Sequence, residues 1–178
     1  MTQWRTLARE EILDERPWLT VERHTIALPD GRIIDNWAWV MTPDFVIVVA
    51  ITTENKYLCF RQMKYALPEG TLAVVGGYIG DGEEPLLAAQ RELREETGYE
   101  AGEWIEMGQY CLDPNRGVAQ GHLFLARGAH WVTEIDSDDL EPQELIEMEP
   151  EAVRTAMRAG EFSVMSWTAA LALSFLYE

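Results

Sequence analysis

The stretch GYIGDGEEPLLAAQRELREETGY, residues 77–99, combines a glycine-rich segment with the pattern of a short helix. Pro85 suits the first turn of a helix, because the N–H group that it lacks has no partner there. Gly98 is typical of the residue that ends a helix in the left-handed conformation. The glycines within 76–82 predict an irregular loop before the helix. Side chains at helical spacing predict a buried stripe that consists of Leu86, Ala89, Leu93 and Thr97.

Three glutamates lie away from that stripe. Glu92, Glu95 and Glu96 are neighbours on a helix and share one face. Their mutual repulsion is unfavourable unless a cation neutralises it, and Mg²⁺ is usually held by a few carboxylates together with substrate phosphates. The face therefore predicts a divalent cation site. A solvated acidic helix is the plainer alternative, but it leaves the glycines at both ends and Arg91 unexplained.

The same stretch resembles the Nudix box, whose pattern is G-x5-E-x7-R-E-U-x-E-E-x-G-U, where U is a bulky apolar residue. Seven fixed identities match, and Tyr99 loosely fills the last apolar position. A pattern with so many fixed positions is far more specific than a lone glycine motif. The other matching residues are Gly77, Glu83, Arg91, Glu92, Leu93, Glu95, Glu96 and Gly98.

The order of the predicted elements favours an α+β protein with helices packed on a mixed sheet. The resemblance implies an α/β/α sandwich, the Nudix fold. It also implies a single domain over 1–178, in which 1–42 form an antiparallel β extension and dimerisation element. Strands are predicted at 19–28, 32–41, 45–52, 57–63, 72–75, 104–110, 122–126 and 146–148, helices at 149–160 and 163–177, and a strand or short helix at 4–16.

Charge and composition exclude several classes of protein. The net charge of −17 disfavours binding to nucleic acid, and an anionic substrate would need metal ions to screen the site. Cys59 and Cys111 lie inside apolar runs and are predicted to be buried, reduced thiols. Residues 1–16 do not read as a signal peptide and no apolar run could span a bilayer, so we expect a soluble cytoplasmic protein without a membrane partner.

Beyond the box, the chain is similar to the ADP-ribose pyrophosphatase branch of the family. Residues 61–65, RQMKY, resemble its R-Q-Y-R segment, and Pro114 lies where the branch carries a proline. Residues 28–31 and 160–162 resemble its N-terminal hairpin turn and the segment before its last helix. One departure is 73–77, AVVGG, where the branch has E-x-P-A-G, so another nucleotide substrate stays open.

The resemblance implies hydrolysis of the pyrophosphate bond of a nucleoside diphosphate linked to another group, with Mg²⁺ or Mn²⁺ as cofactor. ADP-ribose or a related nucleotide sugar would give AMP and a sugar phosphate. Glu92, Glu96 and the carbonyl of Gly76 are the implied metal ligands. Glu83 either binds the metal or holds Arg91.

For the implied catalytic residues, more than one role or more than one residue stays open. Glu95 is a further ligand candidate at the metal, and Arg91 either orients the glutamates or makes only a surface pair with Glu95. In the branch a general base comes from an acidic loop, which corresponds to 136–144 here. Glu144 fits the register best and Glu141 next, while a merely solvated loop is an equal alternative.

Candidate substrate contacts come from cations and tryptophans. Arg61 and Lys64 suit phosphates, or face solvent at a strand edge, and Arg116 is a further candidate. Trp37 and Trp39 could stack a nucleobase, although tryptophans at alternate strand positions more often belong to a core or a dimer interface. The resemblance and these strands together predict a homodimer.

Three functions therefore compete. The first is a nucleotide-sugar pyrophosphatase that acts on ADP-ribose or a related compound. The second is a Nudix hydrolase for another nucleotide, such as a dinucleotide or a nucleoside triphosphate. The third is a nucleotide-sensing module without catalysis, which would be expected to carry a degraded box, whereas this box is intact.

Overall fold

The computed structural model describes residues 3–136, 140 and 142–177. The chain forms two compact units. One contains the residues up to Asp44 together with Cys111–Gln120, and the other contains Phe45–Tyr110 and the residues from Gly121 onward. The expectation of a single domain over 1–178 stays a prediction.

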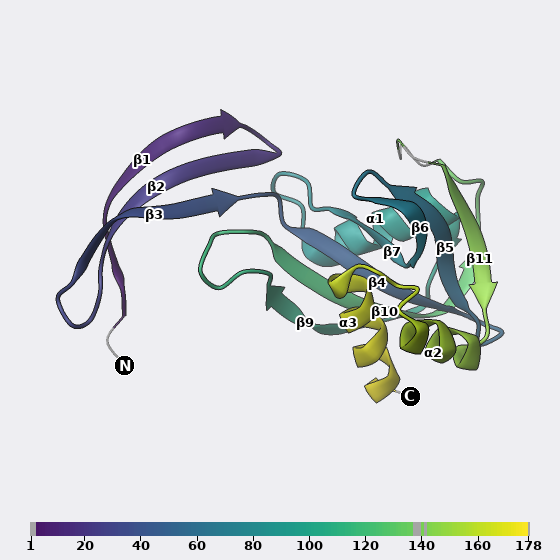
Figure 1. Ribbon diagram of the computed structural model, residues 1–178. Coiled ribbons are helices and arrows are strands. Elements are labelled where there is room, and N and C mark those ends of the chain that lie inside the picture. The colour runs from purple at the N-terminus through teal and green to yellow at the C-terminus, as the bar shows by residue number, and fades with distance from the viewer. Residues whose placement is uncertain (1–2, 137–139, 141, 178) are drawn as a thin grey trace. The chain divides into compact units, whose positions relative to one another are not determined.

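The first unit is built on a three-stranded antiparallel sheet, so the predicted β extension is confirmed (Figure 1). Its strands follow the chain in the order β1-β2-β3, with tight turns between them. Residues 4–16, which were expected as a strand or a short helix, form a strand. The strands are β1 (Arg5–Glu15), β2 (Leu19–Ala27) and β3 (Ile33–Met41).

The second unit contains a mixed sheet, as expected. β4 (Phe45–Thr52) pairs in parallel with β10 (Gln120–Trp131) and antiparallel with β5 (Tyr57–Lys64) and β7 (Val75–Tyr78). The main path runs β11-β5-β4-β10-β8, with β6 beside β5, β7 beside β4 and β9 beside β10. The remaining strands are β6 (Leu67–Ala73), β8 (Tyr99–Glu100), β9 (Glu103–Cys111) and β11 (Gln143–Met148).

Helices cover both faces of this sheet, which confirms the α/β/α sandwich (Figure 1). Residues 46–50 of β4 are all buried, and a strand buried on both faces needs a layer on each side. α1 packs on β4 and β7, and α3 packs on β4. No helix among the described residues combines the length and apolarity that crossing a lipid bilayer requires. The helices are α1 (Pro85–Thr97), α2 (Pro150–Ala159) and α3 (Met165–Ser174), which continues into a 3-10 turn, η1 (Phe175–Tyr177).

The predicted strand at 72–75 is wrong in extent. The structure has two strands there, β6 and β7, so Gly76 and Gly77 lie in a strand and not in an irregular loop. β7 pairs closely with the start of β4. The approach is so close that a Cβ atom on Gly76 would lie only 2.8 Å from the carbonyl oxygen of Val46.

Two burial predictions are also wrong. Leu86 is 40% exposed, because it borders a cavity with Trp104 and Phe124 instead of packing in the core. Cys111 is exposed, since the last three residues of β9 are uncovered. Cys59 is buried as expected, and burial raises its pKa to about 12.

Candidate active site on the glutamate face of α1

Glycine and proline fix both ends of α1. Pro85 occupies the first turn, as the sequence predicts. Gly98 ends the helix with φ of 76° and donates its N–H to the carbonyl of Arg94 at 2.8 Å. A Cβ atom on Gly98 would overlap the carbonyl oxygen of Thr133, and Val132 donates its N–H to the Gly98 carbonyl at 2.8 Å. The end of α1 is therefore locked against the segment that follows β10.

Arg91 is the centre of the polar cluster on this helix. Its guanidinium binds Glu83 through two parallel hydrogen bonds, from Nε to Oε1 at 2.9 Å and from Nη2 to Oε2 at 3.0 Å. Nη1 donates to Glu92 at 2.7 Å and to Glu95 at 3.0 Å. Nη2 also donates to the carbonyl of Tyr78 at 3.1 Å. Arg91 thus contacts far more than the single partner that an i,i+4 surface pair would provide.

These contacts favour the ionised forms of Glu83 and Arg91. The hydrogen bond from Arg91 holds the pKa of Glu83 below its usual value, and hydrogen bonding to Glu83 raises the pKa of Arg91. Glu83, just before the helix, and Glu92 and Glu95 on it all bind this one guanidinium, and Glu96 follows on the same helix. Negative charge is therefore in excess, and a bound cation would offset it.

The two firmest ligand candidates lie against β7. Glu96 is only 9% exposed, and its Oε2 accepts a hydrogen bond from the N–H of Gly76 at 3.3 Å. The Glu92 carboxylate occupies the space in which a Cβ atom of Gly77 would stand. Glycine at 77 is therefore required for Glu92 to approach the strand this closely.

The donor set suits Mg²⁺ or Mn²⁺, because it consists of carboxylate and carbonyl oxygens. Within the described ranges, no three such side chains converge at the geometry of a formed metal site. The guanidinium of Arg91 now binds two of the carboxylates that would serve, Glu92 and Glu95. Glu83 is positioned to hold Arg91, which is the second of the two roles considered for it.

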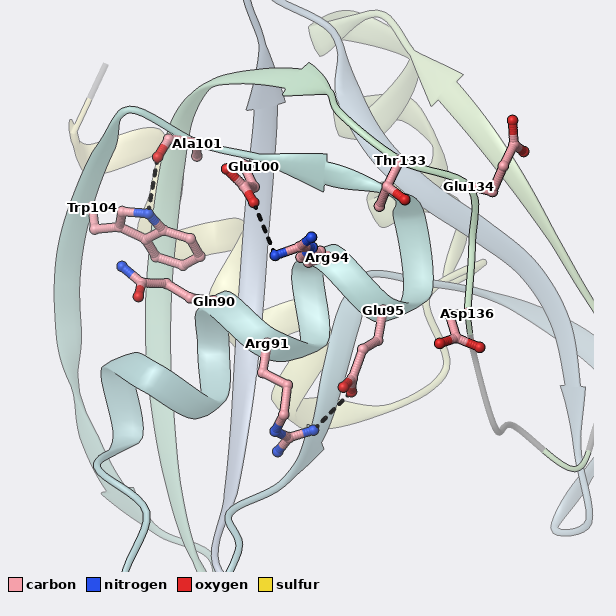
Figure 2. A pocket seen from close by; sticks show the side chains of 10 residues that line it. All are labelled: Gln90, Arg91, Arg94, Glu95, Glu100, Ala101, Trp104, Thr133, Glu134 and Asp136. Atoms are coloured by element: carbon pink, nitrogen blue, oxygen red, sulfur yellow. Dashed lines mark hydrogen bonds and ion pairs between the residues drawn. The ribbon is translucent and has the colours of Figure 1, made fainter.

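A cavity of about 690 Å³ lies along the side of α1 that carries Arg91 and Glu95 (Figure 2). The segment after β10 forms its opposite wall, where Asp136 donates its N–H to the carbonyl of Glu95 at 3.0 Å. Asp136 lies in the predicted acidic loop but was not singled out from the sequence, because only the fold brings it beside Glu95. The other lining residues are Gln90, Arg94, Glu100, Ala101, Trp104, Thr133 and Glu134.

The predicted general base and the phosphate contacts fall on neighbouring strands. Glu144 in β11 lies opposite Arg61 in β5, with Nε and Oε2 3.7 Å apart and both side chains mostly exposed. Lys64 ends β5. Glu141 lies outside the described residues. The roles of these four residues stay predictions.

The remaining candidates belong to the first unit, where they hold the loop 112–119. The indole N–H of Trp37 donates to the carbonyl of Asn115 at 3.0 Å. The ring of Trp39 packs against Gly117, where a Cβ atom would lie 2.5 Å from its Nε1. Both rings are half-buried. The observed contacts are those of the structural alternative, and base stacking stays a prediction.

Trp39 and Arg116 also have other partners inside this unit. Trp39 stacks on His24 with ring centroids 5.2 Å apart. His24 is buried, and its Nε2 lies 2.6 Å from Oε2 of Glu22. Arg116 pairs with Asp113 at 3.3 Å. Sequence reasoning missed the stacking of His24 on Trp39, because it depends on the pairing of β2 with β3.

Comparison with known proteins extends these observations. Residues 41–168 match the model of the NUDIX domain, and residues 4–40 match that of the nucleoside diphosphate sugar hydrolase N-terminal domain. A crystal structure of an ADP compounds hydrolase superposes with a TM-score of 0.83 at 19% identity and covers 99% of this chain and 95% of its own.

Curated relatives are similar over most of this chain. The ADP-ribose pyrophosphatase of Bacillus subtilis is 27% identical over 88% of this chain and 83% of its own length. The methanol dehydrogenase activator of Bacillus methanolicus is 31% identical over 70% of this chain and 66% of its own length. The ADP-sugar pyrophosphatase of Mus musculus is 30% identical over 64% of this chain and 57% of its own length. The chain thus spans less than two thirds of the last two proteins.

The family match covers the whole of the second unit's sheet and the glutamate face of α1. It therefore agrees with the pattern of residues 77–99 and with the observed fold. The chain belongs to the Nudix hydrolase family, and an N-terminal domain of the nucleoside diphosphate sugar hydrolases precedes its Nudix domain.

Proposed function

We propose that this chain hydrolyses the pyrophosphate bond of ADP-ribose or a related nucleotide sugar and releases AMP and a sugar phosphate. The observation that carries the proposal is that Glu83, Glu92 and Glu95 bind Arg91 while Glu96 lies against β7, so that negative charge is in excess along α1. The N-terminal domain and the activities named for the Bacillus subtilis and mouse relatives favour a nucleotide sugar.

In this proposal Glu92, Glu96 and the Gly76 carbonyl hold Mg²⁺ or Mn²⁺. The ion, when bound, neutralises the pyrophosphate and lowers the pKa of a coordinated water. Arg91 keeps Glu92 and Glu95 in place, and Glu83 keeps Arg91 in place. Glu83 therefore orients Arg91, and Arg91 orients Glu92 and Glu95, the carboxylates that are proposed to face the substrate.

Proton removal from the attacking water needs a carboxylate near the metal. Glu95 already belongs to the cluster, while Glu144 and Glu141 come from the acidic segment before and within β11. Glu144 is the leading candidate by its register with the family. Arg61 and Lys64 in β5 are the proposed phosphate contacts, with Arg116 as a further one.

The rest of the proposal concerns assembly and location. The chain is proposed to be a cytoplasmic homodimer whose contacts involve residues 1–42 and whose Trp37 and Trp39 line the interface or the base site. The exposure of β1 supports the proposed dimer. Every residue of this strand is exposed, including the apolar residues Leu7, Ile12 and Leu13.

Activity is tested with purified full-length protein, ADP-ribose and Mg²⁺, with products identified by mass spectrometry. Wild type should release AMP and ribose phosphate, and Glu96→Gln should lose turnover while its thermal unfolding stays cooperative. Glu151→Gln, at an exposed position in α2, is the matched control and should stay active. Equal inertness of wild type and Glu96→Gln on a panel of nucleotide sugars, dinucleotides and nucleoside triphosphates would favour the sensing module instead.

A further inference from the structure

The C-terminal end of α1 is bonded to the segment that follows β10. Carbonyl groups at the end of a helix have no partner within the helix, so they need one elsewhere. The Gly98 carbonyl accepts hydrogen bonds from the N–H groups of Val132 at 2.8 Å and Thr133 at 3.2 Å. The Glu95 carbonyl accepts one from the N–H of Asp136 at 3.0 Å. These three bonds form a backbone lock between α1 and residues 132–136.

The lock requires glycine at position 98. A Cβ atom there would overlap the carbonyl oxygen of Thr133, which belongs to the backbone and cannot swing aside as a flexible side chain can. Gly160, which ends α2, has the same φ of 76°, but a Cβ atom on it would meet nothing within 4 Å. The two glycines therefore share a conformation that favours glycine and differ in this contact.

The lock brings an acidic side chain into the candidate active site. Asp136 lines the cavity of about 690 Å³ together with Arg91 and Glu95. The Asp136 carboxylate lies on the side of the cavity toward Glu95, whereas the carboxylate of the nearby Glu134 points away (Figure 2). Asp136 does not belong to α1, so its position relative to Glu95 depends on the backbone bonds of the lock.

Two carboxylates that face one cavity can orient a water molecule. Glu95 accepts the hydrogen bond from Arg91 through Oε2 at 3.0 Å, and a carboxylate has capacity for further donors. A water molecule that donates one hydrogen to Glu95 and the other to Asp136 has its lone pairs directed away from both carboxylates. Its oxygen is then presented to a phosphorus atom on the other side.

We propose that Asp136 is a further catalytic residue, which orients the attacking water together with Glu95, and that Gly98 is the positioning residue that holds it there. This inference rests on the proposed hydrolysis and adds to it a residue from outside α1. The contacts of Glu92 and Glu96 with β7 do not involve Asp136. Loss of Asp136 should therefore lower turnover while substrate and metal still bind.

The first experiment removes the carboxylate. Asp136→Ala should lower kcat for ADP-ribose by about tenfold to a hundredfold, because the water is no longer held in its reacting position. The KM and the Kd for Mn²⁺ should stay within about twofold of wild type, since binding is not affected. Asp136→Asn keeps one acceptor oxygen and should recover part of kcat. Glu151→Ala, at an exposed position in α2, is the control and should keep wild-type turnover.

The second experiment breaks the lock. Gly98→Ala should lower kcat as Asp136→Ala does, whereas Gly160→Ala carries the same backbone strain without the overlap and should keep its turnover. Because the glycine acts through the aspartate, the double variant should be no slower than Asp136→Ala alone. Losses that add up in the double variant would refute the positioning role of Gly98.

Hydrogen exchange, followed by mass spectrometry, tests the lock without any turnover. Exchange at 132–136 should be faster in Gly98→Ala than in wild type or Gly160→Ala, and unchanged exchange would refute the lock. Should Gly98→Ala fail to fold, Asp136→Ala and Asp136→Asn still decide the catalytic role. That role is overturned if wild type is active and Asp136→Ala turns over equally fast, or if its Mn²⁺ affinity falls in parallel with kcat. Inertness of wild type would instead refute the proposed hydrolysis, and the role of Asp136 with it.

Discussion

The carboxylate of Glu92 lies against the Cα atom of Gly77, in space that any larger residue would fill. The contact joins α1 to β7 at the point where the proposed metal ligands meet. It also explains why the glycine that opens the box lies in a regular strand: its role is close approach and not a turn.

The first prediction concerns that contact. Gly77→Ala should keep the fold but displace Glu92, and a shift of about 1 Å in a catalytic group can cost about a hundredfold in rate. The comparison is with Gly102→Ala, because a Cβ atom on Gly102 would meet nothing within 4 Å. Steady-state kinetics on ADP-ribose should show loss of kcat/KM for Gly77→Ala only, and equal loss in both variants would refute the argument.

The second prediction tests the forked geometry of Arg91. Arg91→Lys keeps the charge but cannot bind Glu83, Glu92 and Glu95 together, so activity should fall by about tenfold to a hundredfold, as for other residues that orient metal ligands. Because the ligands themselves remain, the loss should shrink as the Mg²⁺ concentration rises. Arg158→Lys, whose ion pair with Glu151 spans 3.4 Å at the surface of α2, serves as the control. A loss that does not depend on metal concentration would contradict a positioning role.

The third prediction uses pH. Arg91 holds the pKa of Glu83 below its ordinary value of 4.5, so the ionised Glu83 stabilises the fold above that value and this contribution is lost as the pH falls through the lowered pKa. The difference in unfolding free energy between wild type and Glu83→Gln should therefore be largest above about pH 5 and shrink in more acidic solution. Urea unfolding across this range measures it.

Glu84→Gln is the control for that series, because the Glu84 side chain makes no capping hydrogen bond to the helix. It should run parallel to wild type at every pH. A Glu83→Gln difference that is constant with pH would show that the charge of Glu83 is not what Arg91 recognises.

The fourth prediction separates the two thiols. Burial raises the pKa of Cys59 to about 12, so almost no thiolate forms near neutral pH, whereas Cys111 is exposed. A disulfide reagent at pH 8 should label one thiol in the folded protein and both in denaturant. Cys111→Ser should abolish labelling of the folded form, and two thiols that react at equal rates would contradict the burial of Cys59.

How much of this molecule the sequence predicts depends on the range of the interactions. The bounds of α1 follow from Pro85 and Gly98, which act on their own neighbours, and β4 follows from a continuous apolar run. The cluster around Arg91 was predictable because its members share a helix turn or a motif. These are local patterns, which are visible in the sequence alone.

The misjudged features depend on distant partners. Gly76 belongs to a strand only because β4 lies beside it, and Asp136 meets Glu95 only because β10 ends next to α1. Leu86 has the right spacing for the core but borders a cavity. Nothing near these residues in sequence carries that information.

The loop 112–119 has a consequence for engineering. It emerges between two strands of the Nudix sheet, yet it is held by Trp37 and Trp39 of the N-terminal sheet. A chimaera that exchanges only residues 1–40 between relatives would sever these contacts, whereas one that transplants both segments together preserves them. The transferable module is thus discontinuous along the chain, and a boundary drawn at residue 40 cuts through it.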